Sequence, residues 1–211
     1  MSEPTVIVMS APSGAGKSTV LERVLREVEG LRFSVSHTTR PPRAGEVEGV
    51  HYRFVSREAF KALKREGRLL EWARVHAHLY GTTRAEFDAA RRDGVDVLLD
   101  LDVQGAAQVR AAIHDAVRIF LLPPSYEDLE RRLRGRGQDD AEAIRRRLER
   151  AAEEVILYRE YDYVVVNDDL DTCVAAVKSI IAAARCRTSR VEERARRIIE
   201  TFHSKEGKEN A

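Results

Sequence analysis

A loop near the amino terminus combines glycines, a lysine and a serine at the spacing of a phosphate-binding loop. It has the sequence Ala11-Pro12-Ser13-Gly14-Ala15-Gly16-Lys17-Ser18. The pattern G-x-x-x-x-G-K-[ST] is met at Gly16, Lys17 and Ser18, while Ala11 takes the place of the first glycine. Glycines let backbone N–H groups approach an anion, the lysine adds a point charge for the β and γ phosphates, and the serine offers a hydroxyl to Mg²⁺. The loop therefore predicts a phosphate site with a magnesium ion beside it.

The segments on either side place this loop between a strand and a helix. Residues 5–9 form a run typical of a strand buried on both faces. After the loop, apolar residues recur at helical spacing, at Val20, Leu21, Val24, Leu25 and Val28. An ordinary glycine-containing turn is the alternative. The motif and its strand–helix context together favour a phosphate site.

Two acids lie at the end of a second buried strand, which is predicted at residues 95–102. Asp100 and Asp102 stand where the strand ends, at the edge where parallel sheets bind ligands. An acid in this position commonly holds Mg²⁺ through a water molecule, so Asp100 joins Ser18 as a candidate metal partner. Two solvated loop carboxylates are the alternative.

Arginines gather in two further segments. Arg40 and Arg43 lie in a loop that its prolines constrain, and Arg136 stands between Gly135 and Gly137. Arginine pairs with phosphate in a planar fork and keeps its charge, and glycine hinges suit a lid that closes over phosphates. Most of the other arginines between residues 131 and 147 have acidic neighbours, which favours a solvated helix face.

No residue stands out as a general base, and the predicted chemistry does not need one. A phosphate monoester is already anionic near pH 7, because its second pKa is about 6. Catalysis then consists of aligning two phosphates and neutralising their charge. Cations without a base therefore indicate phosphoryl transfer between nucleotides.

The order of the predicted elements indicates an α/β protein with a parallel sheet covered by helices on both faces. Short alternating strands between residues 35 and 94 predict a small mixed insertion, so the core comprises residues 1–34 and 95–184. Short strands are expected at residues 32–37, 51–56 and 69–75, with a turn or strand end at 79–83. Further core strands are expected at residues 117–122 and 163–167, and helices at 106–112 and 141–158. The lid is expected at about residues 125–150. Residues 185–211 are expected to be a carboxyl-terminal helix and a disordered tail.

Composition narrows the functional classes. A net charge of +1 gives no large field for nucleic acid or membrane binding, and no apolar run approaches the roughly 18 residues of a membrane span. The two cysteines form no disulfide framework, which favours the cytoplasm.

Motifs spread over about residues 4–184 resemble the guanylate kinase family, enzymes that move a phosphate from ATP to GMP. They lie at residues 10–18, 34–40, 42–46, 52–55, 70–73, 80–82, 99–105, 135–137 and 166–169. The resemblance implies a P-loop NTPase core, an inserted GMP-binding subdomain and a helical lid. It also implies direct in-line transfer, ATP + GMP = ADP + GDP with Mg²⁺, serving GMP recycling in purine metabolism.

The resemblance assigns roles by matching position. The residues implied for ATP are Ala11, Pro12, Ser13, Gly14, Ala15, Gly16, Lys17, Ser18, Thr19 and Asn167, the last beside the adenine. Those implied for the GMP phosphate are Ser36, Arg40, Arg43, Tyr52 and Tyr80, and those for guanine are Glu71, Thr82 and Asp102. The implied catalytic residues are Lys17, Arg40, Arg132, Arg136 and Arg147. Thr82 is often serine in the family, a change that keeps the hydroxyl.

Three alternatives stay open. A kinase for TMP or AMP would need a base pocket without two carboxylates. A peptide-binding module would be expected to lose the phosphate-loop residues, which are present here. A regulatory GTPase would carry an Asn-Lys-x-Asp segment after a core strand, which this sequence lacks.

The carboxyl-terminal segment carries an apolar helical stripe at Val191, Ala195, Ile198, Ile199 and Phe202. Such a stripe more often packs on its own domain than on a partner, and self-association is the alternative. The assembly is therefore expected to be a monomer or a homodimer. Residues 203–211 are expected to be disordered.

Overall fold

A five-stranded parallel sheet forms the core of the chain. The computed structural model describes residues 4–43, 45–75, 77–135 and 140–209, with side chains through His203. The strands are β1 (Val6–Ser10), β2 (Leu31–Phe33), β7 (Asp96–Asp100), β8 (Val117–Leu122) and β9 (Tyr163–Val166), in the spatial order β2-β7-β1-β8-β9. All neighbouring pairs are parallel. The predicted α/β core is confirmed.

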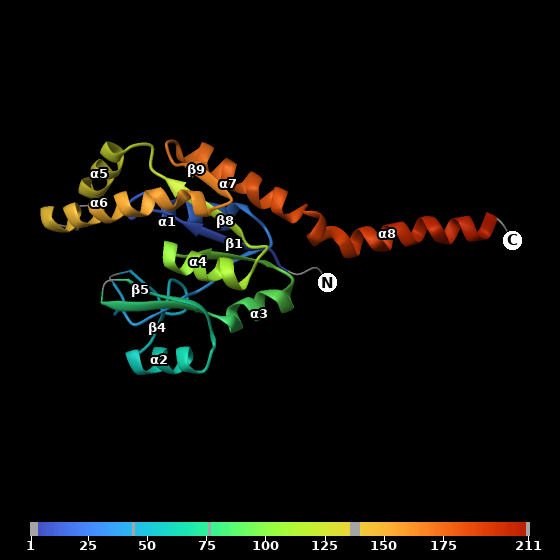
Figure 1. Ribbon diagram of the computed structural model, residues 1–211, viewed down its shortest axis with the longest axis horizontal. Helices are drawn as coiled ribbons and strands as arrows, with labels where there is room; N and C mark the ends of the chain where they lie inside the picture. The colour runs from blue at the N-terminus through green and yellow to red at the C-terminus, as the bar shows by residue number, and fades with distance from the viewer. Residues whose placement is uncertain (1–3, 44, 76, 136–139, 210–211) are drawn as a thin grey trace.

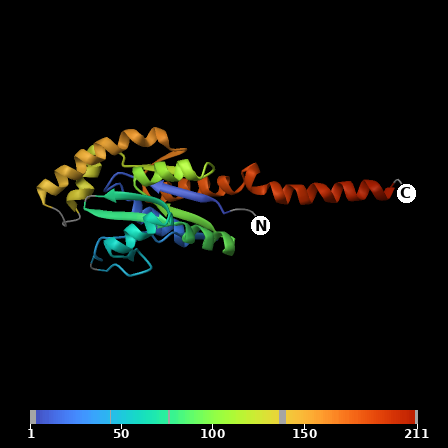
Figure 2. The same cartoon turned by 60° about the horizontal axis from the view of Figure 1, so that its bottom comes forward.

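Helices cover both faces of this sheet, as Figures 1 and 2 show. Alternate residues of β1 point to opposite faces. Ile7 and Met9 pack against α1 (Lys17–Glu27) and α7 (Leu170–Arg185). Val6 and Val8 pack against α3 (Arg84–Asp93) and α4 (Val103–Ala112). The phosphate loop is thus anchored by a strand that is buried on both sides.

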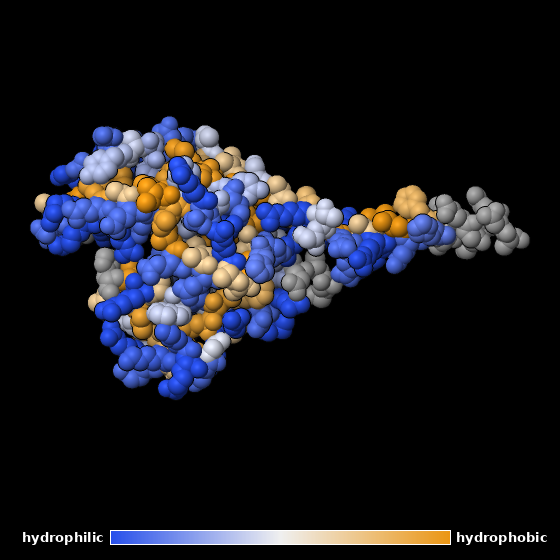
Figure 3. Space-filling view, in the orientation of Figure 1, coloured by the Kyte–Doolittle hydropathy of each residue, from blue (hydrophilic) through white to orange (hydrophobic). Residues whose placement is uncertain are grey.

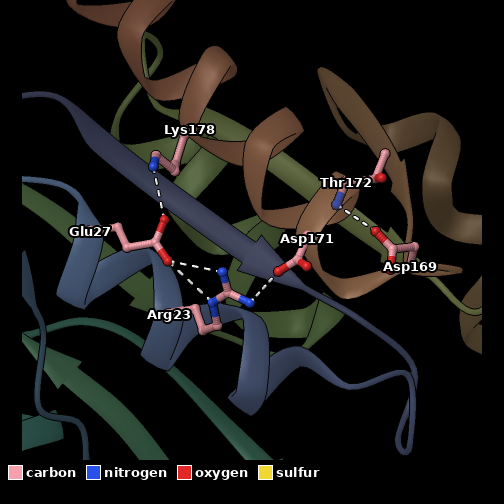
Figure 4. Close-up of polar contacts among 6 residues, drawn as sticks. All are labelled: Arg23, Glu27, Asp169, Asp171, Thr172 and Lys178. Atoms are coloured by element: carbon pink, nitrogen blue, oxygen red, sulfur yellow. Dashed lines mark hydrogen bonds and ion pairs between the residues drawn. The ribbon is translucent and has the colours of Figure 1, made fainter.

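Polar contacts join α1 to α7 on the first of these faces (Figure 4). Arg23 donates to Glu27 and to Asp171, and Lys178 donates to Glu27 at 2.8 Å. Asp169 accepts from the backbone N–H of Thr172 at 2.8 Å and caps α7. These exposed contacts orient the helix that follows the phosphate loop.

The insertion at residues 35–94 contains a small mixed sheet and the helices α2 (Arg57–Arg65) and α3. Its strands are β3 (His37–Thr38), β4 (Arg53–Phe54), β5 (Leu69–Val75) and β6 (His78–Thr83), in the order β4-β3-β6-β5. Strand β3 is parallel to β4 and antiparallel to β6, and β5 is antiparallel to β6. Helix α2 begins after Ser56, whose hydroxyl accepts from the Ala59 N–H at 3.1 Å.

Several boundaries in the insertion differ from the expectation. The strand expected over residues 32–37 is divided, because β2 ends at Phe33 in the large sheet and β3 begins at His37 in the small one. The strand expected over 51–56 is paired only at Arg53–Phe54. Residues 79–83, expected to be a turn or strand end, belong to β6, which forms a hairpin with β5. These strands are defined by their partners in the sheet, which local patterning does not reveal.

Helices α5 (Tyr126–Gly135) and α6 (Ala141–Val155) form the predicted lid region, in yellow and orange at the left of Figure 1. They share a separate apolar cluster that includes Leu129, Leu133, Ile144 and Leu148. The α-helix expected to run to residue 158 ends at Val155 and continues as the 3₁₀ helix η1 (Ile156–Glu160). The apolar face is lost there, since all five η1 residues are exposed. Arg136 and Gly137 lie outside the described residues.

Helix α8 (Thr188–Glu209) projects away from the body (Figure 1). Its first turn is fixed by Arg190, which donates to the Pro4 carbonyl at 2.9 Å and pairs with Asp115. The apolar stripe is not packed on its own domain: Ile198, Ile199 and Phe202 are 50%, 52% and 66% exposed. Figure 3 shows this hydrophobic surface on the projecting helix.

The tail also differs from the expectation, because α8 continues through Glu209 where disorder was expected from residue 203. Pairs spaced four residues apart, Glu192–Arg196 and Glu193–Arg197, support the helix beyond its anchored first turn. Among the residues that the structure describes, no helix combines the length and apolarity of a membrane span.

Candidate active site

The phosphate loop joins β1 to α1 with two glycines in the left-handed region. Gly14 has φ 95° and Gly16 has φ 93°, values that side-chain-bearing residues rarely adopt. Both are also crowded: a Cβ on Gly14 would lie 2.8 Å from a Leu133 methyl, and one on Gly16 would collide with the Asn167 amide. Ala11, which takes the place of the first glycine of the motif, packs against the hydrophobic cluster that the sheet forms with α1 and α7.

Lys17 and Asp100 meet at the carboxyl edge of the sheet. Strands β1 and β7 are parallel neighbours with Met9 opposite Asp100, so the loop after β1 lies beside the end of β7. The Lys17 ammonium pairs with the Asp100 carboxylate and donates to the Leu101 carbonyl at 3.1 Å. The lysine is therefore held at the loop before any phosphate arrives.

The oxygen donors at this edge fit a magnesium ion that stays largely hydrated. Ser18 lies in the first turn of α1 and Asp100 ends β7, and hydroxyl and carboxylate oxygens are the ligands that Mg²⁺ prefers. The described part of the chain holds no cluster of three or more histidine, cysteine, aspartate or glutamate side chains suited to a metal. Such a site suits an ion that takes most of its ligands from water and substrate phosphates.

Arg132 of α5 and Asn167, which directly follows β9, both donate hydrogen bonds to the phosphate loop. The Asn167 amide is buried and donates to the Ala15 carbonyl at 2.7 Å. The Arg132 guanidinium donates to the Asn167 carbonyl at 2.9 Å and to the Ala15 carbonyl at 3.4 Å. The half-buried Arg147 lies on α6, in the same lid region as Arg132. The expected contacts of these three residues with ATP remain predictions.

Arg40 lies in an aromatic cage made by the insertion. Its guanidinium Nε donates to the Tyr80 hydroxyl at 3.1 Å, and its Cζ lies 5.5 Å from the ring centre of Tyr52. Burial raises the pKa of Tyr52 to about 12, so this hydroxyl stays protonated and able to donate. Arg43 is exposed in the same loop. The structure thus brings together Arg40, Tyr52 and Tyr80.

Ser36 lies beside Thr82, which is paired with Glu71. Its hydroxyl lies 3.1 Å from the Thr82 hydroxyl on β6. Glu71 pairs across the hairpin with Thr82, and both are buried, at 3% and 1% exposure. Burial raises the pKa of Glu71 to about 7, although hydrogen bonds from the Thr82 hydroxyl and N–H oppose that rise. The buried carboxyl group of Glu71 therefore has a pKa close to neutral pH.

Asp102 approaches Glu71 from the end of the large sheet, with Gly105 next to both carboxylates. Its Oδ1 accepts from the Gly105 N–H at 2.9 Å and caps α4, so the helix begins earlier than the expected residue 106. Its Oδ2 is buried and has no hydrogen-bond partner within the described structure, although Arg150 of α6 approaches to 3.9 Å. A buried carboxylate oxygen without a donor indicates a ligand that supplies one.

Two residues with clear roles in this geometry escaped sequence reasoning. Glu46 forms an ion pair with Arg40 and organises the loop around it. Gly105 lies against the Glu71 carboxylate. The only available signal was their presence in the motifs at residues 42–46 and 99–105, which does not state what they contact.

The parallel sheet, the phosphate loop at its carboxyl edge and the acids beside it define a P-loop nucleotide phosphotransferase. The guanylate kinase family model matches residues 3–184. The chain belongs to the guanylate kinase family and is a phosphotransferase enzyme.

Individual relatives agree with this assignment. The chain is 49% identical over 195 residues to a guanylate kinase of Syntrophotalea carbinolica, covering 92% of this chain and 93% of the relative. It is 50% identical over 186 residues to one of Zymomonas mobilis, covering 88% and 86%. A crystal structure of guanylate kinase from Anaplasma phagocytophilum is similar with a TM-score of 0.75 at 36% identity, covering 90% of each chain.

Proposed function

We propose that the chain uses this site to phosphorylate GMP with ATP, giving ADP and GDP. This is the reaction of the guanylate kinase family, to which the chain belongs. The observation that carries the proposal is that a phosphate loop, with Ala11 in place of its first glycine, coexists with two acceptors: the buried Glu71 carboxylate and the buried Oδ2 of Asp102. The loop takes the donor phosphates, and the two acceptors recognise guanine.

On the donor side, the loop N–H groups and Lys17 neutralise the β and γ phosphates of ATP. The positive end of α1 adds to this field. Ser18 and Asp100 would hold Mg²⁺, Asp100 through a water molecule, and the ion supplies charge neutralisation on the β and γ oxygens when bound. Lys17 exchanges its partner Asp100 for phosphate oxygens, so its charge becomes available where negative charge builds up.

On the acceptor side, Arg40, Arg43, Tyr52, Tyr80 and Ser36 bind the GMP phosphate. An oxygen of this dianion attacks the γ phosphorus in line, and the bond between that phosphorus and the bridging oxygen of ADP breaks. The electron pair of the broken bond stays on ADP. Because the attacking oxygen of the dianion carries no proton, no side chain has to remove one. The proposed roles of Arg132, Arg136 and Arg147 are to neutralise charge on the transferring phosphate.

At the base, guanine presents two donors side by side, N1–H and the exocyclic amino group. Ionised Glu71 and Asp102 are acceptors only, and the Thr82 hydroxyl, which donates to Glu71, holds that carboxylate in place. Adenine presents a bare acceptor at N1 and would leave Asp102 Oδ2 without a donor and Glu71 with its Thr82 donors alone. The donor that Asp102 Oδ2 lacks is thus supplied by the ligand.

We also propose that α5 and α6 close over the phosphates as a lid. Their side-chain cluster is separate from the two clusters that flank the large sheet, which allows movement as a unit. Leu129 and Leu133 nevertheless lie close to Gly14 of the phosphate loop. Closure would then be coupled to the loop and would exclude water from the reaction.

For the assembly and location, we propose a homodimer in the cytoplasm, where ATP and GMP are available. The exposed stripe of α8 favours the dimer over the monomer, because at least half of the surface of Ile198, Ile199 and Phe202 is exposed in a single chain.

The experiment that tests the function is a coupled assay of ADP release with ATP and a panel of monophosphates. GMP is expected to be turned over far faster than AMP or TMP. A kinase for AMP or TMP would reverse that order. A peptide-binding module on this fold would release no ADP with any of them.

A further inference from the structure

Glu46 holds one side of the Arg40 guanidinium in a two-point ion pair. Glu46 Oε1 accepts from Nη2 at 2.7 Å, and Oε2 accepts from Nη1 at 2.9 Å. Glu46 is itself fixed, because Oε2 also accepts from the Arg43 N–H at 2.7 Å, and the Glu46 N–H donates to the Arg43 carbonyl at 3.0 Å. The carboxylate therefore has a set position before any ligand binds.

The remaining donors of Arg40 divide into two groups. Nη1 also donates to the Pro41 carbonyl at 2.8 Å, and Nε donates to the Tyr80 hydroxyl at 3.1 Å. Glu46 accepts from the end of the fork, between Nη1 and Nη2. The second Nη2 hydrogen lies on the other edge, beside the Nε hydrogen. Because the Nε hydrogen is donated to Tyr80, this edge offers a phosphate two neighbouring donors: the second Nη2 hydrogen and the hydroxyl hydrogen of Tyr80.

The surroundings strengthen this arrangement. The Arg40 and Glu46 side chains are only 10% and 18% exposed, so solvent screens their attraction weakly. The hydrogen bonds between them raise the pKa of Arg40 and lower that of Glu46. The rings of Tyr52 and Phe54 lie 5.5 and 6.0 Å from Cζ and limit movement of the guanidinium plane.

We propose that Glu46 is a positioning residue for the acceptor phosphate. It fixes the plane of Arg40 so that the second Nη2 hydrogen and the Tyr80 hydroxyl face the phosphate together. Because Glu46 accepts from the Nη1 and Nη2 hydrogens at the end of the fork, it stays in place when GMP binds and does not compete with the phosphate. The inference rests on the proposed role of Arg40 in holding GMP.

The test compares Glu46→Gln with Glu58→Gln, a matched loss of charge at an exposed residue of α2. In Glu46→Gln, an amide N–H₂ would face a guanidinium N–H₂, so half of the fork is lost. Misplacement of Arg40 should lower kcat/KM for GMP by about 10- to 100-fold. The loss should appear mainly as a higher KM for GMP, with KM for ATP unchanged. Glu58→Gln should match the wild type in all three constants.

A second arm separates positioning from a general role in folding the loop. In an Arg40→Ala background, Glu46→Gln should have no further effect on KM for GMP, because the group on which it acts is gone. Glu46→Asp keeps the charge but is one methylene shorter, so it should show an intermediate defect and guards against a misfolded Gln variant. Thermal melting of each variant checks the fold.

The outcomes are distinguishable. A wild-type KM for GMP in Glu46→Gln overturns the inference, and a lowered KM overturns it in favour of competition. Additive effects in the Arg40→Ala background assign Glu46 to loop stability alone and also overturn it. If Arg40→Ala itself leaves KM for GMP unchanged, the proposed acceptor site is wrong, which is a different failure from the loss of the Glu46 role.

Discussion

Gly105 and Glu71 approach each other so closely that no side chain fits between them. A Cβ built on Gly105 would lie 2.7 Å from Glu71 Oε2 and 3.5 Å from Asp102 Oδ1. The Gly105 N–H also donates to Asp102 Oδ1 at 2.9 Å. One glycine in the first turn of α4 thus sets the spacing of the two carboxylates that are proposed to recognise guanine.

Gly105→Ala is predicted to impair GMP use without unfolding the protein. Alanine favours the helix by about 1 kcal/mol over glycine, which offsets part of the crowding, so the melting temperature should change little. The displaced Glu71 carboxylate should lower kcat/KM for GMP at least about tenfold while KM for ATP stays constant. Gln104→Ala, at an exposed position on the same turn, is the control. Equal kinetics for the two variants would remove Gly105 from base recognition.

GMP affinity is predicted to rise with pH through neutrality. The pKa of Glu71 is about 7, and only the ionised carboxylate can accept from both guanine donors. KM for GMP should therefore fall as the pH rises from about 6 to 8. The GMP phosphate also titrates in this range, with a second pKa of about 6, so Glu71→Gln is the control. The wild type should show a pH dependence beyond that of the variant; identical profiles would exclude Glu71 as its source.

Lys17→Ala is predicted to abolish most turnover. Loss of one preorganised charge at a transferring phosphate typically costs about 100- to 1000-fold in kcat. Lys17 is half-buried and its ammonium contacts Asp100 and Leu101 at the carboxyl edge of the sheet, outside the hydrophobic core, so the fold should survive. Steady-state kinetics and circular dichroism on the same sample measure both effects. Near-normal turnover by a folded variant would contradict the donor side of the mechanism.

The projecting part of α8 is predicted to mediate self-association and to contribute nothing to catalysis. A chain ending at Glu193 keeps the Arg190 anchor and loses Ile198, Ile199 and Phe202. Light scattering should show a dimeric full-length chain and a monomeric shortened chain with unchanged kcat/KM. The full-length Ile198→Glu variant is the control for truncation. A mass that neither change alters would assign the assembly to another surface.

Local sequence patterns predicted the core because its strands are buried on both faces and its loop has a strict spacing. Strands β1, β7, β8 and β9 fall where apolar runs indicated them, and the glycines of the phosphate loop have the positive φ angles that the motif requires. The extents of the two-residue strands β3 and β4 could not be predicted, since their pairing partners alone define them.

Contacts that local sequence patterns do not report explain why Glu46 and Gly105 were not predicted as site residues. Glu46 holds Arg40 from six residues away, and Gly105 meets Glu71 across the boundary between insertion and core. The exposure of the α8 stripe is a similar case, because periodicity reports an apolar face and not what covers it. The roles taken from resemblance, including those of Arg132, Arg147 and Asn167, stay predictions that substrate kinetics can test.

The most direct test is the ratio of kcat/KM for GMP to that for AMP in the wild type, Glu71→Gln and Asp102→Asn. The wild type should prefer GMP by roughly 10,000-fold or more, because AMP supplies neither of the two donors that guanine offers to Glu71 and Asp102. Each variant should lower that ratio mainly by impairing GMP, since an amide still accepts but has lost the charge. If both variants keep the wild-type ratio, these carboxylates do not recognise the base, and the account of the acceptor pocket is wrong.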